Sequence, residues 1–388
     1  MMNFNGNERK INDTYAEINL KRLRKNFELV KKYSNKDPRR TIRVCSIVKA
    51  DAYGHGMCEV AEVLVKSGTD YLGTADYSES IKLSDHLKKF SKKKVPVLCL
   101  GLLTDEKFFG DVISRNIEVS IADIKSAEKL HDYAKSVNKK VSVQMQIDSG
   151  INRTGFKIKD TFEAVRKLKQ SENFEITGIY SHFATSEISK NNYALKQLED
   201  FKSLIRELEL NSMKLGLKHI CNTGGILNYN DPFFNMVRPG ISLYGYYPDR
   251  KKLVKDIGIK PVMTLRSKVK FIKTLDKGQS ISYGRKYFTK SETLIASLPL
   301  GYGDGYPRLL TNRAKVYIKG KLYPVVGTVC MDWIMVNIGN SSSIKVNDEV
   351  EIFGSRYAAD NLSEMIGTIP YEITCNVTKR VERVYTNN

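Results

Sequence analysis

The chain has 388 residues, too many for one ordinary core, and 41% of them are hydrophobic, which is usual for a globular protein. Its 63 lysines and arginines against 43 acidic residues give a formal net charge of +20. That charge would suit a nucleic-acid partner, but the lysines are spread over predicted helix faces without a zinc-finger, basic-zipper or RNP-type motif. We therefore predict two or three domains, a lysine-rich solvated surface and no nucleic-acid partner.

No apolar run approaches the ~20 residues that a membrane helix needs. Residues 1–10 are polar and lack the apolar core of a signal peptide. The six cysteines are widely spaced with no CxxC pair, which indicates small buried hydrophobes in a reducing compartment rather than a metal site. We expect a cytoplasmic protein with no metal and no membrane contact.

Taken in order, the chain begins with residues 15–20, after which a helical pattern continues through residue 29. From residue 43, short β-rich runs alternate with amphipathic stretches. The predicted strands are 43–49, 71–75, 95–100, 117–121, 141–147, 176–182, 218–221 and 236–244. The predicted helices between them include 77–89, 124–137, 161–169 and 191–208. Eight strands with intervening helices predict a (β/α)₈ TIM-type barrel.

After about residue 258 the pattern changes to short strands separated by Gly, Pro, Asn and Asp turns. The predicted strands there are 263–273, 293–298, 315–318, 323–329, 334–338 and 349–353. We therefore predict a barrel domain over 1–258 and a C-terminal, mostly-β domain over 259–388.

Five polar residues lie at or just after the ends of predicted barrel strands, where the chemistry of such barrels collects. They are Lys49, Arg153, His182, Asn222 and Arg238. This coincidence predicts a catalytic barrel.

Lys49 lies in the stretch 47–56, between a predicted strand and a predicted helix. Partial desolvation at a strand end lowers an amine's pKa, and a neutral amine can attack a carbonyl to form a Schiff base. Gly54 and Gly56 leave room for a ligand to approach the backbone. The alternative is a lysine that only extends its head group into solvent.

The stretch 47–56 resembles the cofactor-lysine motif of alanine racemases, which are enzymes that use pyridoxal 5'-phosphate (PLP). The opening at residues 16–20 also resembles theirs, where it leads into the first barrel helix. The resemblance runs from Ala16 to about Tyr371 with at least six motifs in order. It implies that Lys49 holds PLP and acts as one catalytic base.

Three further motifs imply cofactor contacts, each with a structural alternative. His182, in Ser-His-Phe-Ala, would face the cofactor ring, or it is a satisfied structural histidine. Asn222 and Thr223 precede a predicted helix and would bind the phosphate, or Thr223 only caps that helix. Arg238, in Met-Val-Arg-Pro-Gly-Ile, would face the pyridine nitrogen and leave it unprotonated, since arginine keeps its proton. Its alternative is a structural salt bridge.

The same resemblance adds backbone contacts from Gly240 and Ile241 to the phosphate, together with Tyr53 and Tyr371. Two residues of the β domain would serve the substrate. Met331 would contact its carboxylate and close the small side-chain pocket, and Tyr302 would gate its entry.

Tyr283, in Ile-Ser-Tyr-Gly, resembles the second catalytic base of the family. Tyrosine is a poor base at neutral pH unless cations such as Arg153 or Arg285 favour the phenolate. The alternative is a packing aromatic, which is common among 21 tyrosines. In the family this tyrosine comes from the second subunit, so the resemblance implies a homodimer that shares its active sites.

The chain departs from the family around Arg153, which would steady the substrate carboxylate and Tyr283. Gln146 stands where many members have a carbamylated lysine, and Ile151 stands where they have methionine. A neutral amide braces an arginine more weakly than a charge does. We therefore expect a bound anion such as chloride beside Arg153.

These motifs lead us to expect a PLP-dependent racemase that interconverts L- and D-alanine, supplying D-alanine for a bacterial cell wall. A serine or broad-specificity racemase is the main alternative, because an added hydroxyl is small. A PLP-dependent decarboxylase and a non-catalytic PLP carrier are others; Arg238 and Tyr283 count against the first, and the β domain counts against the second.

Overall fold

The computed structural model describes residues 12–37, 40–90, 94–249, 255–340 and 343–387. The polar stretch 1–10 lies outside the described residues. Backbone contacts divide the chain into two compact units. The barrel unit is Arg22–Lys260, and the β unit is Pro261–Asn388 together with the described part of the first 21 residues.

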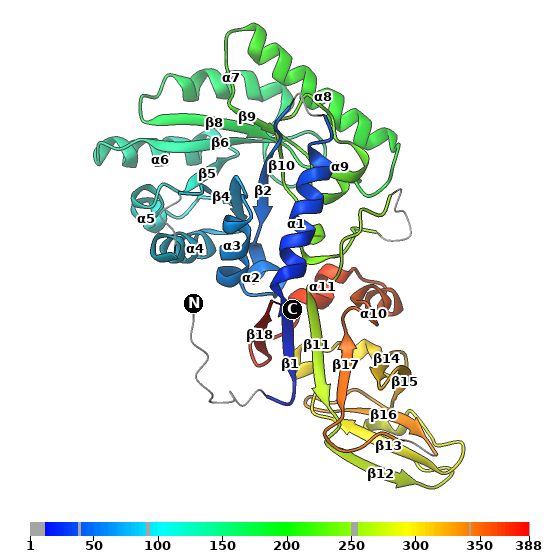
Figure 1. The fold of residues 1–388 in the computed structure, drawn as a ribbon. Coiled ribbons are helices and arrows are strands. Elements are labelled where there is room, and N and C mark those ends of the chain that lie inside the picture. The colour runs from blue at the N-terminus through cyan, green and yellow to red at the C-terminus, as the bar shows by residue number, and fades with distance from the viewer. Residues whose placement is uncertain (1–11, 38–39, 91–93, 250–254, 341–342, 388) are drawn as a thin grey trace. The chain divides into compact units, whose positions relative to one another are not determined.

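The barrel unit is a nearly closed barrel of eight parallel strands surrounded by helices (Figure 1). In their order around the sheet, the strands are β10 (Met236–Val237), β2 (Arg43–Ile47), β3 (Tyr71–Thr74), β4 (Val97–Leu102), β5 (Glu118–Ile121), β6 (Val141–Asp148), β8 (Phe174–Tyr180) and β9 (Leu217–His219). Backbone hydrogen bonds from Asn235 to Lys218 and from Arg238 to Cys221 join the last strand to the first. The predicted barrel is confirmed.

The helices of the barrel unit follow the strands in alternation. They are α1 (Leu20–Ser34), α2 (Lys49–Tyr53), α3 (Met57–Lys66), α4 (Tyr77–Phe90), α5 (Phe109–Ser114), α6 (Ile124–Ser136), α7 (Ile158–Lys169), α8 (Asn192–Leu210) and α9 (Thr223–Asn228). Short elements complete the unit: β7 (Phe156–Lys157), which pairs with β6, η1 (Glu106–Phe108) and η2 (Ile241–Tyr244).

Local sequence explains these elements. β3 and β5 are buried at every position, as expected for parallel strands covered on both faces. Helix α8 buries Leu198, Phe201 and Ile205 at helical spacing, and the Asn191 side chain accepts hydrogen bonds from its first turn. The predicted strand 236–244 is wrong after Val237, because Pro239 has no N–H to extend a ladder.

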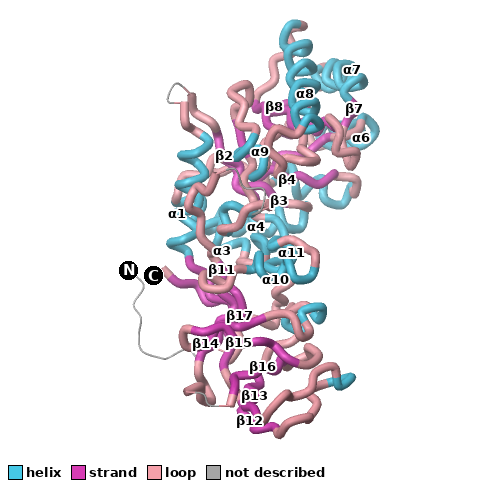
Figure 2. The backbone as a smooth tube through the Cα atoms, turned by 90° about the vertical axis from the view of Figure 1, so that its right-hand side faces the viewer, coloured by secondary structure: helices cyan, strands magenta, loops and turns pink. Residues whose placement is uncertain are grey.

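The β unit is built on one nine-stranded sheet (Figure 2). In spatial order its strands are β12 (Phe271–Leu275), β13 (Thr293–Leu298), β16 (Ile334–Gly339), β15 (Lys321–Val326), β14 (Lys315–Ile318), β17 (Glu349–Phe353), β11 (Met263–Lys268), β1 (Tyr15–Asn19) and β18 (Glu382–Thr386). Its helices are α10 (Ala359–Ile366), α11 (Pro370–Cys375), η3 (Tyr283–Arg285), η4 (Tyr302–Asp304) and η5 (Arg308–Leu310). The expected mostly-β domain is confirmed.

Two details of the β unit correct the predicted elements. Strand β1 pairs with β11 and β18, so this N-terminal segment lies in the β unit and not in a barrel domain that starts at residue 1. The predicted strand 263–273 is two strands, because Val269 donates to Asp348 and the next amide, Lys270, donates to Ser297. The chain changes neighbours at that point.

The cysteines are all free; Cys45, Cys99 and Cys221 are buried, whereas Cys375 is exposed. Within the described ranges, no helix is both long and apolar enough to cross a membrane.

Candidate active site

The barrel places five predicted site residues at one edge of its sheet. Because the strands are parallel, their carboxyl ends lie together. Lys49 follows the end of β2, Arg153 that of β6, His182 that of β8, Asn222 that of β9 and Arg238 that of β10. The structure therefore brings these residues to the same end of the barrel unit.

Lys49 begins a left-handed turn. The next four residues, Ala50 to Tyr53, have φ between 51° and 57° although none is glycine. Such a conformation costs roughly 1–2 kcal/mol per residue. Two carboxylates hold the turn: Glu79 accepts from the amide of Ala50 at 2.7 Å, and Asp51 accepts from that of Met57 at 2.9 Å. The turn thus fixes the half-buried Lys49 at one end and Tyr53 at the other.

A cluster of hydroxyls and amides lies close to Tyr53. The amide of Gly240 donates to Oγ1 of Thr223 at 3.2 Å, and that oxygen is 3.0 Å from Oγ of Ser242. A Cβ at Gly240 would lie 2.5 Å from the hydroxyl of Tyr53, so only glycine allows this approach. Hydroxyls and backbone amides are groups that suit a phosphate. Ser242 was not predicted, although it directly follows the motif that contains Arg238.

Asn222, rather than Thr223, caps helix α9. Its side-chain oxygen accepts from the amide of Gly225 at 2.9 Å and from Oγ of Ser186 at 2.8 Å. The alternative that assigned the cap to Thr223 is therefore wrong, and the Thr223 hydroxyl is directed to the Gly240–Ser242 cluster instead. Ile241 begins the buried η2 turn beside it.

Arg238 is buried, with 3% of its surface exposed, and among the described residues no carboxylate accepts a hydrogen bond from it. Its guanidinium donates to Nδ1 of His219 at 2.5 Å, to the Ser181 carbonyl at 2.7 Å and to Nδ1 of His182 at 3.2 Å. The salt bridge considered as its structural alternative is not present among the described residues. Burial lowers the pKa of Arg238. The groups that accept its hydrogen bonds are all neutral.

A buried chain of hydrogen bonds extends from Arg238 into the barrel. Nε2 of His219 donates to Oε1 of Gln144 at 2.7 Å, and Nε2 of Gln144 donates to the Glu118 carboxylate at 2.7 Å. Burial and the charge of Arg238 lower the pKa of His219 well below its usual range, so His219 stays neutral. Sequence reasoning missed this chain; the alternation of inward side chains along β6 and β9 was the available signal.

His182 is also neutral. Burial lowers its pKa to about 3, and the positive charges of Arg238, Arg153 and Lys49 add to the effect. The unfolded chain takes up a proton on this residue below about pH 6.5, whereas the folded protein does not. The stability that neutral His182 provides is therefore complete above about pH 6.5 and is lost progressively as the pH falls toward 3.

We expect the unfolding temperature of the wild-type protein to fall more steeply than that of His182→Gln between about pH 7 and pH 5. Differential scanning calorimetry across that range measures both slopes, and His219, which is present in both proteins, contributes equally to each. Equal slopes would contradict the assignment of a depressed pKa to His182.

Gln146 does not brace Arg153. Its amide donates to Oγ1 of Thr154 at 2.7 Å and accepts from the Tyr180 hydroxyl at 3.1 Å. Arg153 is exposed, and together with Lys49 and Arg238 it acts electrostatically on His182. Three positively charged side chains thus lie at this end of the barrel, around the neutral His182.

The other predicted site residues lie on the β unit. Tyr283 is 72% exposed, Met331 is 52% exposed and Tyr302 is 43% exposed. Backbone hydrogen bonds join the Tyr302 and Met331 loops: the amides of Tyr302 and Gly303 donate to the carbonyls of Cys330 and Met331. The Ser282 hydroxyl joins the Tyr283 segment to the same loop by donating to the Thr328 carbonyl. Tyr371 is half-buried in α11. Three site loops therefore form one exposed surface of the β unit.

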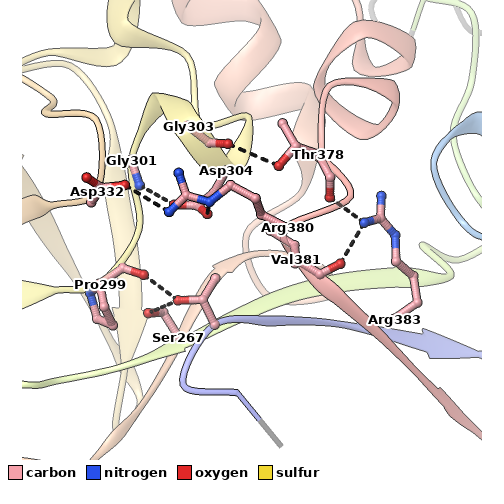
Figure 3. Close-up of polar contacts among 11 residues, drawn as sticks. Ser267, Pro299, Gly301, Gly303, Asp304, Asp332, Thr378, Arg380, Val381 and Arg383 are labelled. Carbon is pink, nitrogen blue, oxygen red and sulfur yellow. Dashed lines mark hydrogen bonds and ion pairs between the residues drawn. The ribbon is translucent and has the colours of Figure 1, made fainter.

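Figure 3 shows how charged side chains connect the Tyr302 and Met331 loops. The Arg380 guanidinium donates to Asp332 at 2.8 Å and lies 3.4 Å from Asp304, whose other oxygen accepts from the amide of Gly301 at 2.9 Å. The Arg383 guanidinium donates to the carbonyls of Val377, Thr378 and Val381 and so stabilises the turn that precedes β18. The two loops thus keep a fixed geometry relative to each other.

Comparison with known proteins gives a consistent result. The sequence profile of the alanine racemase N-terminal domain matches residues 18–248, and that of the C-terminal domain matches residues 262–385. The chain is 37% identical over 385 residues to alanine racemase 1 of Clostridium acetobutylicum, covering 98% of this chain and 97% of that protein. It is 33% identical over 376 residues to alanine racemase of Methanococcus maripaludis, covering 96% and 98%.

Solved structures agree. The alanine racemase of Clostridium difficile 630 has a TM-score of 0.89 and 38% identity, with 98% of each chain covered. That of Bartonella henselae, described with covalently bound pyridoxal phosphate, has a TM-score of 0.85 and 26% identity, with 97% and 100% covered. Since both profiles and full-length relatives match, this chain belongs to the alanine racemase family.

Proposed function

We propose that this protein is a PLP-dependent alanine racemase that works as a cytoplasmic homodimer with shared active sites. The observation that carries the proposal is the buried Arg238, which contacts two neutral imidazoles at the carboxyl end of the barrel strands, the end that also holds the half-buried Lys49. A carboxylate at this position would favour a protonated ring nitrogen, whereas an arginine favours an unprotonated one.

The residues present fit the cofactor. The hydroxyls of Tyr53, Thr223 and Ser242, with the amides at Gly240 and Ile241, would hold its phosphate, and Tyr371 would add a further hydroxyl. Asn222 would hold the helix start in place beside them. His182 and Arg238 would face the ring, and Lys49 would hold the carbonyl end. When bound, PLP supplies a ring that withdraws electrons from the substrate Cα.

The proton transfers are assigned to two side chains. The Lys49 amine would remove or deliver the α-proton on one face of Cα, and the partner subunit's Tyr283 would do so on the other face. Inversion at Cα requires two such groups, because the proton must leave from one face and return to the opposite one. Each group therefore acts as base for one enantiomer and as acid for the other.

Three further residues would handle the substrate. Arg153 would pair with its carboxylate by charge-assisted hydrogen bonds. The Met331 backbone would contact the same carboxylate while its side chain closes the pocket to long substrates, and Tyr302 would control entry. The tie between the Tyr302 and Met331 loops supports this assignment, since it keeps both residues in one fixed frame.

The test is turnover of L-alanine and L-serine by the purified protein with PLP, followed by circular dichroism of the amino acid. We expect conversion of L-alanine to a racemic mixture well above the rate for L-serine. A preference for serine would assign a neighbouring racemase activity, because a small pocket discriminates poorly against an added hydroxyl. Bound PLP without turnover of either substrate would favour a carrier.

The concentration of positive charge at Arg153 leads to a prediction about anions. The Gln146 amide contacts Thr154 and Tyr180 and carries no charge, and within the described ranges no carboxylate forms an ion pair with Arg153. We expect turnover to fall several-fold when chloride is replaced by gluconate at constant ionic strength.

Gln146→Glu provides the matched variant. A carboxylate there would supply the missing charge, so the variant should lose the dependence on chloride while its turnover in gluconate rises. If the wild-type enzyme turns over equally in both salts, and added chloride leaves its unfolding temperature unchanged, no anion is bound there.

A further inference from the structure

Ser282, the residue before the proposed base, has a backbone conformation that side chains other than glycine rarely adopt. Its φ is 66° and its ψ is −175°, a region occupied almost only by glycine. Gly284 and Arg285, which follow Tyr283, also have positive φ, at 70° and 50°. The chain therefore turns sharply on both sides of Tyr283. A strained residue that is not glycine persists only where its surroundings enforce it.

Two reciprocal hydrogen bonds enforce this conformation. Oγ of Ser282 donates to the carbonyl of Thr328 at 2.6 Å, and Oγ1 of Thr328 donates to the carbonyl of Tyr283 at 2.6 Å. Each hydroxyl thus holds the other segment's backbone. Together they hold the carbonyls of Thr328 and Tyr283 in place. The Tyr283 side chain therefore projects from a fixed backbone.

The partner segment is itself fixed. Gly327 has a φ of 78°, and a Cβ there would lie 2.8 Å from the Ile281 side chain and 3.0 Å from Cβ of Ser282. Its amide donates to Asn312 at 2.6 Å. Beneath both segments lies a small apolar core of Ile281, Ile295 and Val326. The segment that holds Ser282 therefore rests on the sheet of the β unit.

The Tyr283 side chain depends on this backbone for its direction. It is 72% exposed, and within the ranges that the structure describes no hydrogen bond restrains its hydroxyl. The nearby Arg285 donates to Ser280 at 3.0 Å, and its guanidinium lies 5.5 Å from the Phe288 ring centre, so neither of these contacts involves Tyr283. The direction of the Tyr283 side chain is therefore set by its backbone, which Ser282 and Thr328 hold.

We propose that Ser282 and Thr328 are positioning residues that hold the proposed base Tyr283 at the angle needed for proton transfer, at a cost in stability at Ser282. This inference rests on the proposed function, because it assigns the purpose of the strain to Tyr283. A side chain that must reach a single proton tolerates little angular error, and misplacement of about 1 Å costs on the order of 100-fold in rate.

The test compares Ser282→Gly, Ser282→Ala, Thr328→Val and Thr328→Ser for unfolding temperature and for racemisation of both enantiomers of alanine. Glycine relieves the strained φ but removes the hydroxyl. We expect Ser282→Gly to unfold at a temperature no lower than Ser282→Ala does, and both to lose about tenfold or more in turnover. Thr328→Val should lose turnover similarly, whereas Thr328→Ser, which keeps the hydroxyl, should stay near the wild-type rate.

A second readout separates positioning from general damage. Tyr283 would remove the α-proton of only one enantiomer, so its misplacement should raise the isotope effect of α-deuterated alanine for that enantiomer. For the other enantiomer Tyr283 only returns the proton, so the isotope effect on removal by Lys49 should not rise. The matched control is Asn347→Gly, which relieves a φ of 72° at an exposed turn of the same unit. It should keep both turnover and isotope effects.

Wild-type turnover is measured first, and its absence would refute the proposed function itself. Given an active wild type, the inference is overturned if Ser282→Gly retains full turnover, if turnover simply follows unfolding temperature across the variants, or if the isotope effects change equally for both enantiomers. Should the Ser282 variants fail to fold, the Thr328→Val and Thr328→Ser pair still decides, since both leave the Ser282 side chain intact.

Discussion

Replacing Lys49 with alanine should lower alanine turnover by about 10³-fold or more, because the change removes both a covalent attachment point and one of the two groups that move the α-proton. The phosphate cluster around Thr223 and Gly240 would remain, so the variant should still retain PLP. Absorbance spectra of the dialysed protein would show bound cofactor without the covalent band, and the dichroism assay would show the loss of turnover.

Two controls make this result specific. Lys66→Ala removes an exposed lysine of helix α3 whose Nζ lies 3.9 Å from the Glu62 carboxylate. This variant should leave turnover unchanged. Adding methylamine to Lys49→Ala should restore part of the rate, because only an amine is missing and the left-handed turn that follows it is held by Glu79 and Asp51. Substantial turnover by Lys49→Ala without added amine would remove Lys49 from the mechanism.

The fold was largely predictable because its signals are local. The parallel strand β4 reads as a continuous apolar run, and helices such as α8 repeat their apolar residues every three or four positions. The place of β1 was not predictable in this way. Its partners, β11 and β18, lie more than 240 residues further along the chain, and no local pattern announces a pairing across that separation.

The candidate site shows the same division. Lys49, His182 and Arg238 were found because each follows a strand and lies in a recognisable motif. Side chains that act through others were missed: His219 and Gln144 are ordinary polar residues in sequence, and only the barrel brings them into line with Arg238. Strain at Ser282 was also invisible, since serine gives no sign of a positive φ.

A mixture of two inactive variants should regain activity if the active site is shared between subunits. Lys49→Ala and Tyr283→Phe each remove one proton-transfer group, so each homodimer should be nearly inactive. In a heterodimer of the two, one site combines both substitutions, and the other combines an intact Lys49 with an intact Tyr283 from the partner chain. Random reassociation makes half of the dimers heterodimers with one intact site of two, so about one quarter of all sites should be restored.

The alternative arrangement gives the opposite result. If Lys49 and Tyr283 of the same chain formed each site, every site in the mixture would lack one group and no activity would return. The experiment is done by co-expressing the two variants with different affinity tags, purifying the doubly tagged dimer, and measuring its turnover against each singly tagged homodimer. The surface that carries Tyr283, Tyr302 and Met331 is exposed on the β unit, as a site completed by a second chain requires. Regained turnover in the doubly tagged fraction alone would therefore mean that Tyr283 of one subunit acts together with Lys49 of the other. The strain at Ser282, which lowers the stability of one chain, would then serve catalysis at a site that contains the Lys49 of its partner.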